Sequence, residues 1–151
     1  MTNPSDVDVS IDLSAMIVTE GLDPSGSGNS VCTGIIVTPG EVDPGKKGNF
    51  KINFAVTSGP PNSTVCTVTD FRFKQQDTTV WNSPKNDPNT QPSGVTENDE
   101  FQWQQTSPLQ IKDKNDNSSV TTYEYILVFN ASGEGYTLPA TFVNDPTIKN
   151  W

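Results

Sequence analysis

The strongest constraint in this sequence is an alternation of apolar and polar side chains with a period of two residues. In residues 6–13 every odd position is apolar and every even position is polar. Similar alternations return at residues 50–57, 101–111, 120–130 and 136–142, the second of these as two short segments. A period of two is that of an extended strand with one buried face and one solvated face. The chain is therefore predicted to consist mainly of β-strands.

Turn-forming residues separate these segments. The 151 residues include 12 Pro and 11 Gly, spread along the whole length, and only 32% are hydrophobic. Helical bundles need long runs of Ala, Leu, Glu and Lys, which this composition does not provide. We therefore predict an all-β fold. It would be one antiparallel β-sandwich domain over residues 1–151, immunoglobulin-like or Greek-key, with about seven or eight strands.

A change of pattern occurs within the strand predicted at residues 64–74. Cys66 and Val68 share one parity, whereas Phe71 and Phe73 take the other. A regular strand cannot move its apolar residues from one parity to the other without an extra residue. We therefore expect a β-bulge near Thr69 and Asp70.

Two further segments are apolar on both faces. Residues 31–38 contain the run Ile35-Ile36-Val37, which predicts burial on both sides. In residues 120–130, Tyr123, Tyr125, Leu127 and Phe129 share one face, and Ile126 and Val128 share the other. A strand with two apolar faces is covered on both sides, so residues 120–130 are expected to be central.

The least regular stretch runs from residue 75 to residue 100. It holds three prolines and many asparagines, and its large apolar residues are Val80, Trp81 and Val95. We predict a long polar loop at 75–100. Loops of this length in compact domains are usually functional or disordered, so this loop is the expected working surface.

Net charge and the absence of histidine exclude several functions. The chain has 18 acidic and 9 basic residues, a formal charge of −9, and no histidine. A negative field repels phosphates and anionic lipid headgroups, so neither nucleic acid nor membrane is an expected partner. No segment approaches the ~20 apolar residues of a membrane span. Catalysis and metal binding that require histidine are excluded.

Other catalytic patterns are also missing. The sequence contains neither a Gly-x-Ser-x-Gly nucleophile motif nor a Gly-x-x-x-x-Gly-Lys phosphate loop. Paired carboxylates could act as acid and base, and the candidates are Asp6, Asp8 and Asp12 on one strand face and Glu97, Asp99 and Glu100 before Phe101. These positions are predicted to be solvated, whereas acid–base chemistry needs a buried pair with one raised pKa. We predict no catalytic residues and no enzyme activity.

A calcium site is the sharpest motif-level hypothesis. Asp113, Asn115 and Asn117 occupy positions one, three and five of an EF-hand-like pattern, with Glu124 at position twelve. Position six is Ser118 rather than glycine, and the flanking residues are predicted to be strands. The alternative is a polar hairpin turn, in which Asp and Asn satisfy local backbone groups. Apart from this calcium, no cofactor is expected.

Tryptophans suggest a second kind of site. Trp81 and Trp103 could stack on the apolar faces of a sugar, and Trp151 is the terminal residue. Trp103 shares its parity with Phe101, so the alternative is that Trp103 belongs to the core.

Cysteines and the N-terminus bear on the compartment. Cys32 and Cys66 both lie in predicted strands, where they could form a disulfide or serve as two small buried thiols. The N-terminus has no basic start and no apolar run of a secretory signal. A cytoplasmic location is therefore predicted, and secretion stays open if a leader has been removed.

Two short segments are similar to a known family. Residues 6–12 read Asp-Val-Asp-Val-Ser-Ile-Asp, and residues 145–148 read Asp-Pro-Thr-Ile. In these segments the chain resembles the small bacterial inclusion-body protein family, whose members are single acidic β-sandwich domains. The resemblance implies a cytoplasmic protein that self-associates, and it brings no catalytic residues.

Together these observations favour a non-catalytic domain that binds a partner or assembles with itself. The edge strands of a sandwich are available for strand addition between chains. One alternative is a carbohydrate-binding module that uses Trp81 or Trp103. The other is a calcium-dependent adhesion-type domain that uses residues 113–117.

Overall fold

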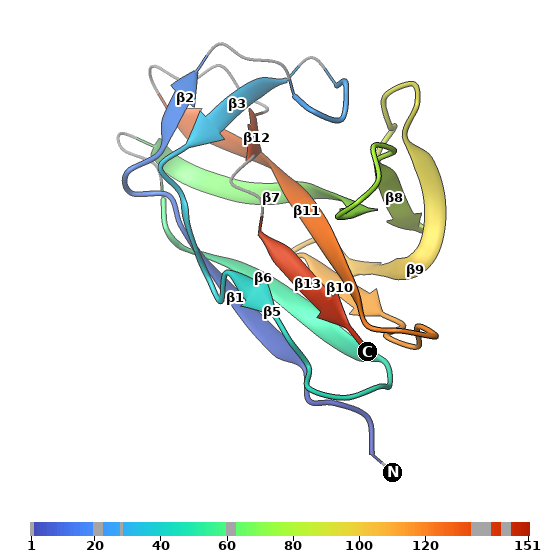
Figure 1. Ribbon diagram of the computed structural model, residues 1–151. Helices are drawn as coiled ribbons and strands as arrows, with labels where there is room; N and C mark the ends of the chain where they lie inside the picture. Colours follow the sequence, from blue (N-terminus) through green and yellow to red (C-terminus); the bar gives the residue numbers. More distant parts are fainter. Residues whose placement is uncertain (1, 20–22, 28, 60–62, 134–139, 143–145) are drawn as a thin grey trace.

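The computed structural model of the chain describes residues 2–19, 23–27, 29–59, 63–133, 140–142 and 146–151 (Figure 1). Every regular element within these ranges is a β-strand, which confirms the all-β prediction. The early strands are β1 (Val7–Asp12), β2 (Ile17–Thr19), β3 (Ser30–Thr33), β4 (Ile36–Thr38), β5 (Glu41–Val42) and β6 (Phe50–Ser58). The later strands are β7 (Ser63–Gln75), β8 (Asn82–Lys85), β9 (Thr96–Gln105), β10 (Gln110–Asp113), β11 (Thr121–Gly133), β12 (Ala140–Phe142) and β13 (Thr147–Asn150).

The prediction of a sandwich with seven or eight antiparallel strands is wrong. The thirteen described strands form one hydrogen-bonded sheet in the order β2-β3-β12-β11-β7-β8-β9-β10-β6-β1-β4, and β13 pairs with both β11 and β5. Four of the described pairings, β1–β6, β3–β12, β5–β13 and β8–β9, are parallel. Alternation within a strand predicts which face is buried, but it does not predict which neighbour the strand will bond.

The sheet curls until it is nearly closed. Only two residues of chain separate β3 from β4, yet β3 lies near one end of the strand order and β4 lies at the other. Strand β9 closes the opposite side, because its first half pairs with β8 and its second half pairs with β10 (Figure 1). The two layers expected of a sandwich are therefore joined into one sheet.

An aromatic cluster fills the interior of this curled sheet. Its members are Phe54, Phe71, Phe73, Phe101, Tyr123 and Tyr125, with ring centroids 4.4–6.0 Å apart in each contacting pair. They come from β6, β7, β9 and β11, so a single core holds distant parts of the chain together. Ile126 and Val128, on the other face of β11, are also buried, which confirms the central position predicted for this strand.

The predicted bulge in β7 is present. Asp70 is opposite Val128 and Val68 is opposite Phe129, so Thr69 is the extra residue. Beyond the bulge, Phe71 and Phe73 enter the aromatic cluster. Asp70 and Arg72 consequently lie on the opposite face of the strand.

Residues 75–100 are only partly the loop that was predicted. Strand β8 lies inside this segment, and β9 begins at Thr96.

The prediction for residues 31–38 also needs correction: the segment divides into β3 and β4, and Ile36 is 59% exposed. Of the alternation predicted at 136–142, only 140–142 falls within the described residues. No helix in the described part of the chain has the length and apolar character needed to cross a membrane.

Candidate functional site

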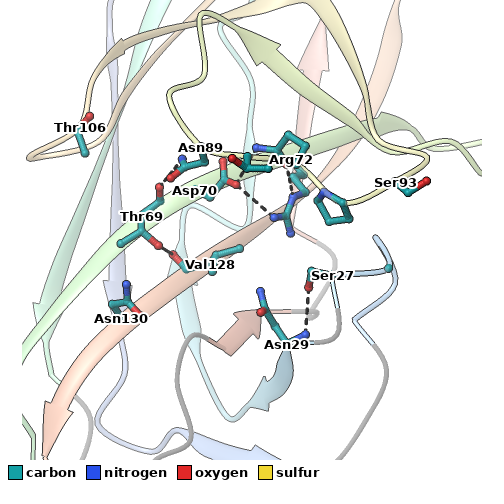
Figure 2. A pocket seen from close by; sticks show the side chains of 14 residues that line it. Ser27, Asn29, Thr69, Asp70, Arg72, Asn89, Ser93, Thr106, Val128 and Asn130 are labelled. Atoms are coloured by element: carbon teal, nitrogen blue, oxygen red, sulfur yellow. Dashed lines mark hydrogen bonds and ion pairs between the residues drawn. The ribbon is translucent and has the colours of Figure 1, made fainter.

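A polar pocket lies against the outer face of β7 and β11 (Figure 2). Its volume is about 650 Å³, within the usual range for small-molecule sites. Its lining residues come from three regions: β7 and β11 with the turn after β9 (Thr69, Asp70, Arg72, Val128, Asn130 and Thr106), the segment before β3 (Gly26, Ser27 and Asn29), and the loop before β9 (Asn89, Thr90, Gln91, Pro92 and Ser93). None of these described lining side chains is aromatic.

The β7 bulge places the charged residues of the pocket. Because Thr69 is an extra residue, Asp70 and Arg72 share the face that points away from the aromatic cluster. In Figure 2, Arg72 and Asp70 lie beside Asn89, while Ser27 and Asn29 lie across from Arg72. The alternation that builds the core therefore also directs two charged side chains toward the pocket.

Arg72 is buried and bonded to three segments of the chain. Its Nη2 lies 3.2 Å from Asp70 Oδ2, and its Nη1 donates to Ser25 Oγ at 3.0 Å. Its Nε donates to Gln91 Oε1 at 2.7 Å, and Asp23 Oδ2 lies 3.6 Å from Nη1. Arg72 thus ties β7 to the segment before β3 and to the loop before β9.

Asp23 is the second buried carboxylate beside Arg72. It accepts hydrogen bonds from the Ser25 backbone N–H at 2.8 Å and from the hydroxyls of Ser25, Ser27 and Thr141. Burial alone would raise the pKa of Asp23. The hydrogen bonds outweigh burial and lower this pKa below its ordinary value. Asp23 therefore stays ionised next to the guanidinium.

Asp70 also belongs to a pair of carboxylates, whose second member is Asp87. Gln91 Nε2 donates to Asp70 Oδ2 at 2.9 Å and to Asp87 Oδ2 at 2.8 Å. Burial, followed by the hydrogen bond with Asp70 and the negative charge of Asp70, raises the pKa of Asp87 to about 7. Asp87 therefore gains or loses a proton near neutral pH.

The two tryptophans proposed as a sugar-binding surface are buried and lie outside the pocket. Trp81 and Trp103 are each 8% exposed, so neither ring presents an open face for stacking on a sugar, and neither lines the pocket. Lys74 Nζ lies 5.5 Å from the centroid of Trp81. Trp103 Nε1 donates to Thr106 Oγ1 at 3.2 Å. The burial of Trp103 agrees with the alternative that it is a core residue.

The predicted calcium ligands do not form an EF-hand-like set. Asn115 Nδ2 donates to the carbonyls of Lys46 and Gly48, and its Oδ1 accepts from the Trp151 backbone N–H at 2.6 Å. Glu124 points elsewhere and pairs with Lys74 at 2.7 Å. Only Asp113 and Asn117 keep oxygens near a common neighbour, which is Asn150. In the described residues, no group of three or more Asp, Glu, His or Cys is placed to hold a metal ion.

The expectation that the paired carboxylates are solvated fails for Glu100. Burial raises its pKa, although the hydrogen bond from Asn150 opposes this shift. Asp113 is fully buried, and burial followed by the charge of Glu100 raises its pKa to about 8. Asp6, Asp8, Glu97 and Asp99 are exposed, as predicted.

The sequence analysis missed Asp23, Asp70, Arg72 and Asp87. One signal could have indicated Arg72. It is the single arginine of the chain, it lies between Phe71 and Phe73, and Asp70 precedes it by two residues. Charged residues that alternate with aromatic ones on a central strand suggest a second covered face. Asp23 and Asp87 follow no pattern, because only the fold brings Asp23 to Arg72 and Asp87 to Asp70.

Comparisons with known proteins add no identity: no protein-family model matches the chain, and no curated protein is significantly similar to it. The inclusion-body resemblance therefore remains a prediction. So does the state of the cysteines, since Cys32 is buried but the side chain of Cys66 lies outside the described residues.

Proposed function

We propose that this chain is a non-catalytic binding module whose polar pocket takes a neutral, hydroxyl-rich ligand of the carbohydrate class. The observation that carries the proposal is the cavity of about 650 Å³ lined by hydroxyl, amide and charged side chains instead of rings. Serine, threonine and asparagine side chains both donate and accept hydrogen bonds, as sugar hydroxyls do. Such a lining favours a polar ligand over an apolar one.

The charges around the pocket favour a neutral ligand. Arg72 is the cation in its lining, and Asp70 and Asp23 lie 3.2 and 3.6 Å from its guanidinium. An incoming anion would meet these two carboxylates as well as Arg72. A phosphate or a carboxylate therefore gains little from the arginine, whereas a neutral hydroxyl can bond to either kind of group.

The arrangement of the acid pair supports binding over catalysis. Glycosidases hold their two carboxyl groups about 5–9.5 Å apart so that the scissile bond or a water fits between them. Asp70 and Asp87 instead share the Gln91 amide and a mutual hydrogen bond. The Gln91 amide, bonded to both, lies where a glycosidase would hold its substrate or water.

Titration with neutral oligosaccharides tests the proposal, after a glycan array has selected the ligand. Asn130 lines the pocket and is exposed, so Asn130→Ala should leave the fold intact and weaken binding about three- to tenfold by removing one hydrogen bond. Ser93→Phe should weaken it further by filling the mouth of the pocket. The matched control is Asn49→Ala, an exposed position outside the pocket, which should bind as the wild type does. Binding that ignores both pocket variants, or no neutral glycan ligand at all, would contradict the proposal.

Self-association is the second candidate, and one observation favours it. Strands β2 and β4 are the two ends of the described sheet, and each carries an isoleucine, Ile17 or Ile36, that is 59% exposed. End strands with unpaired backbone groups and exposed apolar side chains can add strands from another chain.

A further inference from the structure

Four side chains with oxygen atoms meet where β9, β10 and β13 come together. Glu100 comes from β9, Asp113 ends β10, Asn150 ends β13, and Asn117 lies in the turn after β10. The amide nitrogen of Asn150 lies 2.7 Å from Glu100 Oε1, 2.9 Å from Asp113 Oδ1 and 3.5 Å from Asn117 Oδ1. One neutral amide group is therefore the common neighbour of two carboxylates and a third oxygen.

This cluster leaves buried oxygens without partners. Asp113 and Asn150 are both 0% exposed, and Asp113 Oδ2 and Asn150 Oδ1 have no hydrogen-bond partner among the described residues. An unsatisfied buried polar atom is costly, and an unbalanced buried carboxylate is more so. An amide carries only two protons, which cannot serve three oxygens equally.

Neighbouring charges supply only part of the missing positive charge: the charge of Lys114 lowers the pKa of Glu100, but burial outweighs it. Lys114 follows Asp113 in the chain, but its Nζ pairs with Asp99 Oδ2 at 2.9 Å on the exposed side of β9. Asp116 adds a further negative charge near both Glu100 and Asp113. The cluster is therefore acidic, buried and short of a cation.

We propose that Glu100, Asp113, Asn117 and Asn150 bind a divalent cation of the calcium type. All four residues offer oxygen, the ligand that Ca²⁺ prefers, and two of them are carboxylates. A half-turn of the Asn150 amide about its last side-chain bond exchanges nitrogen for oxygen without moving the backbone. Glu100 and Asn117 are only partly buried, so solvent can reach the site and water can complete the coordination.

The ligand set differs from the EF-hand-like pattern in the sequence. Only Asp113 and Asn117 are common to both, while Asn115 and Glu124 are bonded elsewhere. The new ligands come from two other strands, and one of them precedes the C-terminal Trp151. A bound cation would therefore fasten β13 to the β9–β10 hairpin.

Calorimetric titration with CaCl₂ and thermal unfolding with and without a chelator test the site. We expect Ca²⁺ to bind and to raise the midpoint of unfolding by about 5 °C when well above its dissociation constant. Mg²⁺ should do so less, because it requires a tighter octahedral geometry. Asp113→Asn and Glu100→Gln should each weaken Ca²⁺ binding about tenfold or more. Glu97→Gln, the same change at an exposed position of β9, should not alter it.

A third variant separates a cation site from a structural cluster. Asn150→Asp adds a carboxylate to the cluster. In the presence of a chelator the variant should therefore be less stable than the wild type. Ca²⁺ should bind to the variant more tightly and restore its stability. If Asp113→Asn fails to fold, Glu100→Gln at its partly exposed position still decides the question. No heat and no thermal shift at about 10 mM Ca²⁺, above the weakest calcium affinities of natural modules, would overturn the proposal. Equal stabilisation by Mg²⁺, or by Ca²⁺ in Glu100→Gln, would also overturn it.

Discussion

At the scale of single residues, Arg72 joins the fold to the pocket. Its guanidinium contacts Asp70, Ser25 and Gln91, which come from three separate parts of the chain. The side chain is buried, so these contacts exist only if Asp23 and Asp70 balance its charge. The same residue therefore supports the wall of the pocket and limits the charge of what can bind there.

Replacement of Arg72 by methionine should lower the free energy of unfolding by about 3–5 kcal/mol, because two buried carboxylates lose their counter-charge. Urea denaturation at neutral pH measures this loss. Lys149→Met, at a partly exposed lysine 3.9 Å from Asp43, is the control and should cost less than about 1 kcal/mol. A loss of similar size in both variants would mean that the buried network contributes little.

Asp87 gives the protein a pH dependence whose sign is fixed by its raised pKa. In the unfolded chain Asp87 ionises near pH 4, but in the folded protein it holds its proton up to about pH 7. Its contribution to stability is therefore complete below pH 4 and is lost as the pH rises through about 7. Asp87→Asn should remove this loss. The stability of the variant relative to the wild type should therefore increase from about pH 5, below the folded-state pKa of Asp87, to about pH 8, above it.

Denaturation curves of the wild type and Asp87→Asn at the two pH values measure this difference. Asp77→Asn, at an exposed carboxylate outside the pocket, should follow the wild type at both. A wild type that is more stable at the higher pH, relative to Asp87→Asn, would show that the carboxylate pair is not coupled as described.

At the scale of elements, the junction between β3 and β4 decides how the sheet closes. Gly34 lies in this junction with a φ of +76°, a conformation that costs glycine little. A Cβ atom at this position would collide with the backbone carbonyl oxygen of Ala15. Because backbone cannot move aside as a side chain can, the close approach of the two segments requires glycine.

Gly34→Ala should therefore destabilise the protein by at least about 2 kcal/mol, through both the φ strain and the collision. Gly94 is the matched control, since its φ is +93° and an added Cβ would meet nothing within 4 Å. Gly94→Ala should cost only about 1 kcal/mol, for the φ strain alone. Thermal and urea unfolding of the two variants give the comparison. Equal losses would show that the Gly34 junction is not tightly packed.

At the scale of the whole molecule, the nearly closed sheet has two end strands that can take part in association. Ile17 on β2 pairs with Thr33, and Ile36 on β4 follows Thr33 by three residues, so both isoleucines lie beside the Gly34 junction. Each therefore gives its end strand an exposed apolar residue at an edge of the sheet.

If this edge mediates self-association, light scattering should show a mass that rises with protein concentration, and Ile17→Lys should reduce that rise. A lysine on an edge strand disfavours strand addition because its charge would be buried. Val120→Lys is the control, since Val120 is 53% exposed but lies outside the end strands. A wild type that stays monomeric at its highest soluble concentration would contradict self-association.

The sequence by itself determined the all-β character, the inward and outward faces of the central strands, and the β7 bulge. These are properties of neighbouring residues, because side-chain parity along a strand depends only on local backbone geometry. The burial of Phe71 and Tyr125 and the extra residue at Thr69 could therefore be predicted from the alternation alone.

Only the tertiary structure decided which strands pair and which polar side chains meet. It joined two expected layers through β9, brought Asp23 to Arg72 and Asp87 to Asp70, and placed Glu100 and Asn150 around Asp113. These residues are far apart in the chain and follow no common period. Their burial and their shifted pKa values arise from what surrounds them in space, and no local pattern of side chains records that.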